Sequence, residues 1–232
     1  MSRRSIIFCA FAVLAAALFV RLGLWQLARL REKVQRNQVI ASQRLGAPVQ
    51  FASLPRDTAG AHYRATVVSG RFDYDHELVV SFRTHQGSPG AELVTPMRMP
   101  GSDTAVLIDR GWVYSPDGAS VDRARWRERD SATVVGYVEL YAPDLTTASP
   151  SSDARVVRRL SRREIASRIP YPIAPYYVVA TGDSADGAHP ARRALPVLDE
   201  GSHRTYAMQW FAFALIALFG AGMVIRHDRR PR

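Results

Sequence analysis

Two apolar stretches, one near each end of the chain, constrain the fold more than any other feature. The stretch from Tyr206 to Ile225 contains 20 residues without a charge and is followed at once by basic residues. Because a helix rises about 1.5 Å per residue, this stretch can cross the ~30 Å hydrocarbon layer of a membrane. A buried core helix is the alternative, but the lack of a polar face favours a transmembrane helix over residues 206–225.

The other apolar stretch follows two arginines at the N-terminus. It runs from Ile6 to Val20 and resumes after Arg21. Fifteen apolar residues are short for a span, but Arg21 can extend to the headgroups, so we expect a transmembrane helix over residues 6–25. A cleaved signal peptide is the alternative. The apolar residues continue past the alanines that would form the cleavage site, which favours an anchor.

Two spans place both tails on one side of the membrane and the central segment on the other. Six basic residues in the tails and eight on the inner flanks do not decide the orientation. Long connecting domains are exported largely regardless of charge, whereas a short Arg-Arg leader stays inside. We therefore expect a multi-pass protein of the cell (inner) membrane. Its tails, residues 1–5 and 226–232, would be cytoplasmic, and residues 26–205 would form an extracytoplasmic domain.

The central segment has a β pattern. Its apolar residues alternate or come in short β-branched runs, and Gly, Pro and Asp separate the runs. The candidate strands are residues 62–70, 77–82, 92–97, 105–113, 133–140 and 176–180. Many short strands with tight turns indicate one antiparallel sheet or barrel rather than βαβ units. The expected class is an α+β membrane protein, with two transmembrane helices flanking a mainly antiparallel β domain that contains one or two helices.

Two further helices are expected. Residues 26–40 would continue the first span outward. Residues 153–168 would form a helix capped by Ser152 or Asp153, with an apolar stripe of Val156, Val157, Leu160 and Ile165. Residues 182–189 are expected to form a loop.

Composition and motifs exclude several functions. The formal net charge is +10, and its densest run, residues 122–130, interleaves acids with arginines. This run indicates a solvated loop or a docking patch for an acidic partner or lipid headgroups, and no motif indicates nucleic-acid binding. The single cysteine, Cys9, lies in the first span, which excludes a disulfide framework and argues against a thiol-based metal chaperone.

No catalytic constellation is evident, since GxSxG, HExxH and phosphate-loop patterns are missing from the sequence. His85 falls in a turn, which favours a surface role. In the segment Asp109–Trp112 we expect the acid and Arg110 to pair, Gly111 to permit a bend and the tryptophan to cover the core, with a partner-docking edge as the alternative. We therefore expect a protein that is not an enzyme.

The ends of the two spans bring polar and aromatic residues together. An antiparallel pair places one set from each span at the same membrane depth: Trp25, Gln26 and Arg29 from the first, and His203, Tyr206, Gln209 and Trp210 from the second. An interfacial aromatic belt is one interpretation. The two amides and the imidazole have a desolvation cost unless they bond each other or a ligand. His203 could then ligate a haem iron, with an arginine near the propionates.

Three motifs carry a resemblance to a known family. Leu22–Lys33 resembles the LGxWQxxRxxxK signature of the surfeit locus protein 1 family, Val106–Val113 resembles its RGW segment, and His203–Phe211 resembles its HxxYAxQWF ending. Ser202 and Tyr114 depart from the residues common in the family. The resemblance implies a membrane-bound assembly factor for haem-copper cytochrome c oxidase that acts around insertion of haem a into subunit I.

The resemblance assigns the role of haem ligand to His203. The leading hypothesis is transient binding of haem a between the two spans, with oxidase subunits or other assembly factors and membrane lipid as partners. A scaffold or accessory subunit of the oxidase that does not bind haem is the alternative.

Overall fold

The computed structural model describes residues 2–144, 153–182, 189–193 and 198–229. The chain divides into two compact units. One is helical and consists of the residues up to Ala41 and from Val197 onward, and the other is built on β-strands and extends from Ser42 to Pro196.

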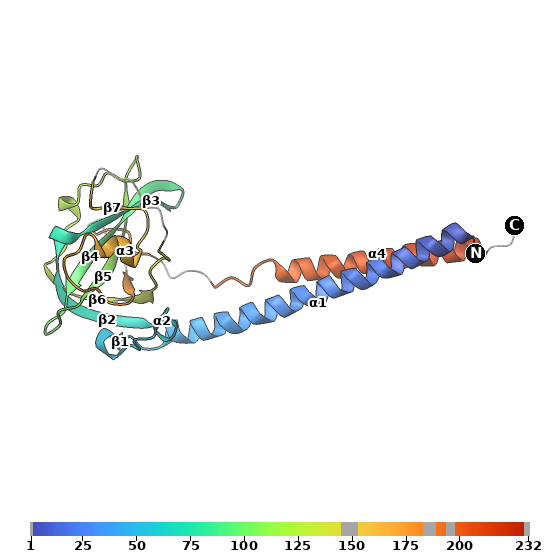
Figure 1. The fold of residues 1–232 in the computed structure, drawn as a ribbon, viewed down its shortest axis with the longest axis horizontal. Coiled ribbons are helices and arrows are strands. Elements are labelled where there is room, and N and C mark those ends of the chain that lie inside the picture. Colours follow the sequence, from blue (N-terminus) through green and yellow to red (C-terminus); the bar gives the residue numbers. More distant parts are fainter. Residues whose placement is uncertain (1, 145–152, 183–188, 194–197, 230–232) are drawn as a thin grey trace. The chain divides into compact units, whose positions relative to one another are not determined.

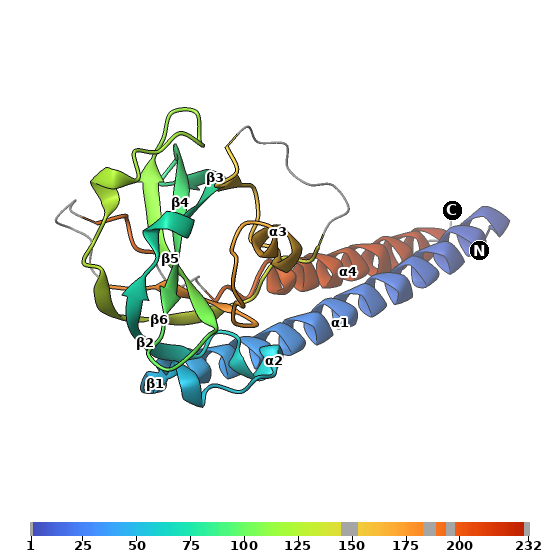
Figure 2. The same cartoon turned by 60° about the vertical axis from the view of Figure 1, so that its left-hand side comes forward.

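The helical unit contains α4 (His203–Asp228) and all but the last turn of α1 (Arg3–Leu45), and the two helices lie side by side and antiparallel (Figures 1 and 2). Both helices are long and apolar enough to cross a membrane. Helix α1 continues without a break past Trp25, which confirms that residues 26–40 extend the first apolar helix.

The two helices meet along a seam with regular heptad spacing. Partly or fully buried residues recur at alternating intervals of four and three. In α1 they are Ser5, Cys9, Ala12, Ala16, Phe19, Gly23, Gln26, Leu30, Lys33 and Asn37, and in α4 they are His203, Ala207, Trp210, Ala214, Ala217, Ala221, Val224 and Asp228. This 3-4 spacing is that of a coiled coil, and the small residues let the backbones approach closely.

Gly23 illustrates the closeness of the seam. A Cβ atom at this position would lie 2.8 Å from the ring of Phe211. Further along, the Cys9 thiol lies 3.8 Å from the carbonyl oxygen of Ala221. The helices are therefore in direct contact over most of their shared length.

In the β unit, five strands form a hydrogen-bonded ring in the order β2–β6–β8–β5–β4, and a β2–β4 pairing closes it. The strands are β2 (Ala65–Phe72), β4 (Ser88–Arg98), β5 (Ala105–Tyr114), β6 (Ser131–Glu139) and β8 (Tyr177–Ala180), and β3 (Leu78–His85) pairs with β4 from outside the ring. Each of the six predicted strands corresponds to one of these. The pairings are mainly antiparallel, but β5 and β8 run parallel.

Short elements complete the unit. They are β1 (Val49–Gln50), η1 (Phe51–Ser53), α2 (Thr58–Ala61), η2 (Tyr74–His76), η3 (Ala124–Trp126), β7 (Val156–Val157) and α3 (Arg162–Ala166). The hairpin between β3 and β4 turns at Gln86 and Gly87, which both have positive φ, as a tight two-residue hairpin turn requires.

The β unit has two main apolar clusters on opposite sides of its strands. All five ring strands contribute to one cluster, which includes Val68, Met97, Ile108 and Val178. The other includes Leu107 and Val179 and packs against β3, β7 and α3. Alternation along β5 sends Val106 and Ile108 to the first cluster and Leu107 to the second, as period-2 burial requires.

The prediction of a helix over residues 153–168 is wrong. Val156 and Val157 form β7, which pairs in parallel with β3, and a helix begins only after Ser161, whose hydroxyl accepts from the Glu164 amide. A β-branched pair suits a strand, and the open edge of β3 provides the partner. Ser152 and residues 183–188 of the expected loop lie outside the described residues.

Candidate functional site

The start of α4 is tied to α1 by the segment that precedes it. The Asn37 amide donates to the Asp199 carbonyl oxygen at 3.0 Å, and Lys33 Nζ lies 4.0 Å from the Asp199 carboxylate. That carboxylate also accepts from the backbone amide of Gly201 at 2.6 Å, and Gly201 has a positive φ of 72°. These contacts turn the chain into α4 so that its first residue, His203, faces α1.

His203 and Gln26 form a polar pair in the seam. The distance between His203 Nδ1 and Gln26 Oε1 is 2.8 Å. Because an amide oxygen can only accept, Nδ1 carries the proton, and the lone pair of the neutral ring is on Nε2. Within the described residues Nε2 makes no hydrogen bond. An imidazole held in this way through one nitrogen is the usual arrangement of a histidine metal ligand.

Trp210 is the second seam residue of α4 after His203. Its ring stacks on Phe19 with centroids 5.7 Å apart and meets Phe213 edge-on at 5.9 Å. The seam is therefore closed by aromatic packing about two and three turns away from His203. Phe19 and Trp210 occupy the space between the helices at this point, and the expected haem position between the two spans stays a prediction.

The other four predicted site residues lie outside the seam, on one flank of the helix pair. Heptad spacing places Arg29 and Tyr206 beside the seam, and Trp25 and Gln209 further from it. All four lie on the same side of the helix pair, where equivalent heptad positions of the two antiparallel helices face each other. The Trp25 and Tyr206 side chains are about half exposed, at 51% and 48%. The Arg29 guanidinium lies 5.8 Å from the centre of the Trp25 ring. We call these four residues with His203 and Gln26 the flank site.

The flank site has the side chains that a haem requires. It offers one imidazole nitrogen for the iron, exposed aromatic rings for the macrocycle and a cation for a propionate. Because Arg29 also pairs with Glu32 at 2.9 Å, it is already oriented along the surface of α1. The residues therefore fit a haem on the outside of the helix pair.

The segment Asp109–Trp112 behaves differently from the sequence prediction. Arg110 does not pair with Asp109. Its fully buried guanidinium binds Glu77, the Thr95 hydroxyl at 2.8 Å and Glu128 at 3.0 Å. Adjacent residues of a strand point to opposite faces, so the two neighbours could not pair without breaking the strand. Sequence reasoning missed both glutamates, because nothing local links them to Arg110.

Residues 122–130 are more than a solvated loop. Arg110 donates to the Trp126 carbonyl oxygen at 2.6 Å, and Glu128 also binds Arg192 at 2.7 Å. The backbone amide of Glu128 donates to the hydroxyl of Tyr74 at 2.9 Å. The run therefore supplies part of the shell around Arg110, while several of its arginines stay exposed.

Gly111 and Trp112 have structural roles. Gly111 has a φ of 121°, and a Cβ there would lie 2.4 Å from the carbonyl oxygen of Ala191. Trp112 is half-buried against Gly90 rather than over the main core, and its ring lies 5.2 Å from His85. His85 is the last residue of β3 rather than part of the predicted turn, and it is partly covered by this indole.

Two histidines form pairs with carboxylates, which could suggest acid-base chemistry. His76 Nδ1 lies 2.9 Å from Asp73, and His62 Nε2 lies 2.8 Å from Glu139. The Tyr171 hydroxyl donates to the same Asp73 carboxylate, and these hydrogen bonds lower the pKa of Asp73 despite its partial burial. His62 stacks on Tyr63 with centroids 3.7 Å apart. Both pairs are thus packed against tyrosines, which favours a structural role.

Comparison with known proteins identifies relatives along the whole architecture. The model of the SURF1 family matches residues 13–215. An uncharacterized SURF1-like protein of Mycobacterium tuberculosis is 24% identical over 220 residues, covering 92% of this chain and 80% of the relative. A SURF1-like protein of Drosophila melanogaster is 25% identical over 227 residues, covering 90% and 74%. Surfeit locus protein 1 of the mouse is 25% identical over 144 residues, covering 56% and 47%. Since the family match includes parts of both long helices and the whole β unit between them, this chain belongs to the SURF1 family.

Proposed function

We propose that this protein is a membrane-bound, non-enzymatic assembly factor of a haem-copper cytochrome c oxidase that holds haem a transiently for insertion into subunit I. Membership of the SURF1 family supports the assembly role. The observation that carries the haem role is the hydrogen bond between His203 and Gln26, which leaves Nε2 of His203 available to a metal. When bound, the haem would supply an iron that His203 would ligate.

The residues of the flank site would have distinct roles. Gln26 fixes the tautomer and the orientation of His203. Trp25 and Tyr206 offer apolar surface to the macrocycle, and Arg29 offers a charge to a propionate. Trp210, which packs in the seam, supports the helix pair rather than the ligand. A single protein ligand on an outer flank would suit a carrier, because a second protein ligand and a closed cleft would both slow release.

The function implies a location. We propose that α1 and α4 cross the cell membrane with the tails in the cytoplasm, so that the flank site lies near the outer edge of the lipid. Haem a and subunit I, both membrane-associated, could then reach it laterally.

The test is expression of the full chain in cells that make haem a, followed by purification in detergent and absorption spectroscopy. We expect haem in the wild-type protein and a haem content at least tenfold lower in the His203→Ala variant, because the variant lacks the imidazole that would hold the iron. His227→Ala, at the other end of α4, is the matched control and should retain haem. Equal haem content and an unchanged iron spectrum in His203→Ala would remove the ligand assignment.

The same preparation addresses the alternative of a scaffold or accessory subunit. That alternative predicts stoichiometric co-purification with the oxidase and no haem spectrum in the isolated protein. A carrier should instead be recovered with haem and without a full complement of oxidase subunits.

A further inference from the structure

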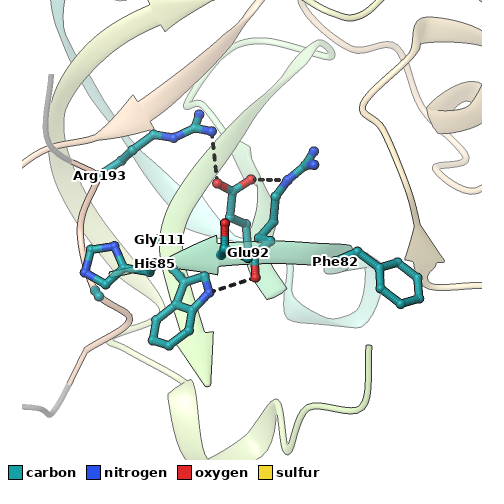
Figure 3. Close-up of a pocket in the computed structure, with 9 residues that line it drawn as sticks. Phe82, His85, Glu92, Gly111 and Arg193 are labelled. Atoms are coloured by element: carbon teal, nitrogen blue, oxygen red, sulfur yellow. Dashed lines mark hydrogen bonds and ion pairs between the residues drawn. The ribbon is translucent and has the colours of Figure 1, made fainter. Parts of the chain in front are cut away.

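A second candidate site lies in the β unit, next to the β3–β4 hairpin. It is a cavity of about 270 Å³ lined by residues of β3, β4, β5 and the segment that ends at Arg193. Figure 3 shows the Glu92 carboxylate between two guanidinium groups, with His85 and Phe82 on opposite sides of the view. Every lining residue belongs to the β unit, so this cavity is distinct from the flank site.

The cavity is built around two arginines that share one carboxylate. Arg83 Nε donates to one oxygen of Glu92 at 3.0 Å, and Arg193 Nη2 forms an ion pair with the other oxygen at 3.0 Å. The Glu92 side chain is 12% exposed, whereas those of Arg83 and Arg193 are 35% and 40% exposed. The acid is therefore inside and the two cations reach the solvent-accessible space.

The second acid near the arginines is Asp109, which contacts Arg193 but is not among the residues that line the cavity. Its Oδ2 atom is 3.7 Å from Arg193 Nη1, and its Oδ1 atom accepts from the Gly111 amide at 3.0 Å. With Asp109 ionised, two cations face two anions. With Asp109 protonated, the group retains one uncompensated positive charge that opens to the cavity.

The aromatic wall of the cavity is rigid. Trp112 lies against Gly90, where a Cβ would come within 2.4 Å of the indole, and its Nε1 donates to the Arg83 carbonyl oxygen at 3.3 Å. His85 lies 5.2 Å from this ring. A ligand thus meets a fixed apolar surface beside a cationic one, which is the usual composition of a small binding pocket.

We propose that this cavity binds a carboxylate carried by a group the size of one amino-acid residue, held by Arg83 and Arg193 with its apolar part against Trp112. The arginines already hold the Glu92 carboxylate in a charge-assisted fork, so their geometry suits a second one. A phosphate dianion would exceed the single surplus positive charge. The small volume favours an acidic residue of a partner protein over a larger metabolite.

Proton uptake by Asp109 is linked to this binding. Burial and the neighbouring Glu92 raise the pKa of Asp109 to about 7, while Arg193, the Gly111 amide and Arg83 oppose the shift. Tyr137 of β6 and Tyr177 of β8 also lie within electrostatic range of Asp109. A bound carboxylate competes with ionised Asp109 for Arg193, so binding should strengthen as the pH falls through 7.

The experiment uses the full chain in detergent, labelled with 5-fluorotryptophan and titrated while the ¹⁹F resonance of Trp112 is followed. The Trp112→Phe variant assigns that resonance. The probes are N-acetyl-glutamate methylamide for an acidic side chain, N-acetyl-leucine for a chain end, benzoate for a free small acid, and inorganic phosphate. N-acetyl-glutamine methylamide is the neutral control of the same size.

We expect a saturable shift with the acidic probes, none with the glutamine analogue and weaker binding of phosphate. A stronger effect of the two amino-acid derivatives than of benzoate indicates a peptide ligand, and the reverse order indicates a free acid. Arg83→Gln and Arg193→Gln should each weaken binding about tenfold, since each removes one charge-assisted contact. Arg129→Gln, an exposed arginine elsewhere, should change nothing.

Two results overturn the proposal. One is the lack of a saturable shift with every carboxylate in a wild-type protein that is folded by circular dichroism. The other is binding that persists unchanged in folded Arg83→Gln protein, which covers the case in which the Arg193 variant does not fold. Asp109→Asn tests the proton linkage: it should bind at least as tightly as wild type and with a flatter dependence on pH between 6 and 8, whereas an unchanged pH profile would exclude Asp109 as the linked group.

Discussion

His203 in the helical unit and Arg110 in the β unit are both polar side chains withdrawn from water, and they differ in how fully their hydrogen bonds are used. Arg110 is fully buried, and its guanidinium donates hydrogen bonds to Thr95, Glu77, Glu128 and a backbone carbonyl. His203 uses one ring nitrogen, on Gln26. A saturated group holds a fold together, whereas a half-used imidazole can still take a ligand. Arg110 and His203 both lie in motifs that carry the family resemblance. The contrast in their hydrogen bonds is the reason why we assign Arg110 a structural role and His203 to a candidate site.

Arg110→Met should produce the largest effect. It leaves Glu77, which is almost fully buried, without its cation, and breaking a buried ion pair costs about 3–5 kcal/mol. We expect the β unit to unfold at a much lower denaturant concentration, as followed by near-ultraviolet circular dichroism. Arg129→Met is the matched control on an exposed arginine. A stable Arg110→Met protein would show that the saturated network is dispensable.

Gly111→Ala tests the backbone that carries Arg110. Gly111 has a positive φ, which strains any residue with a side chain. A Cβ atom there would also lie 2.4 Å from the carbonyl oxygen of Ala191, so there is no room for a side chain. We expect a loss of roughly 2–3 kcal/mol from strain and displaced backbone. Gly101→Ala has the same sign of φ but open space around it, so it should lose only about 1 kcal/mol. Equal losses in thermal melts of the two variants would contradict the packing argument.

The pH dependence of the free energy of unfolding should reflect the titration of Asp109. Its pKa is raised to about 7 in the folded chain, against about 3.9 when unfolded. Between these values the folded state keeps a proton that the unfolded state has released, so stability falls as the pH rises, by at most about 1.4 kcal/mol per pH unit. Denaturant titrations of wild type and Asp109→Asn at pH 5 to 8 measure the slope, which the substitution should remove. A slope that persists in Asp109→Asn would have to come from another group.

Gln26→Leu should have the smallest effect on stability, because it removes one hydrogen bond, worth about 1 kcal/mol. It should nevertheless lower haem content several-fold, since the His203 tautomer is no longer fixed. Gln38→Leu, on the exposed face of the same helix, is the control. A large loss of thermal stability in detergent with haem content unchanged would reverse the roles that we assign to the two polar groups.

The strands could be predicted from the sequence because apolar residues that alternate or form short β-branched runs are separated by Gly, Pro and Asp, and all six predicted strands are present. The segment 153–168 could not, since its apolar spacing fits a helix and only the free edge of β3 selects a strand for Val156 and Val157. In the candidate site, helical spacing and the antiparallel arrangement already placed His203 near Gln26. Which residues fill the seam and which lie on the flank depends on side-chain volumes, so Trp210 could not be separated from Tyr206 beforehand.

The sequence by itself determined the two apolar helices, the β domain between them and the residues at which the family motifs occur, because these depend on local periodicity and residue type. Only the tertiary structure decided that Arg110 binds Glu77 rather than its neighbour Asp109, that the seam is closed by Phe19 and Trp210, and that Arg83 and Arg193 converge on Glu92. These contacts join residues far apart along the chain. Their geometry follows from how strands and helices pack, which no local pattern records.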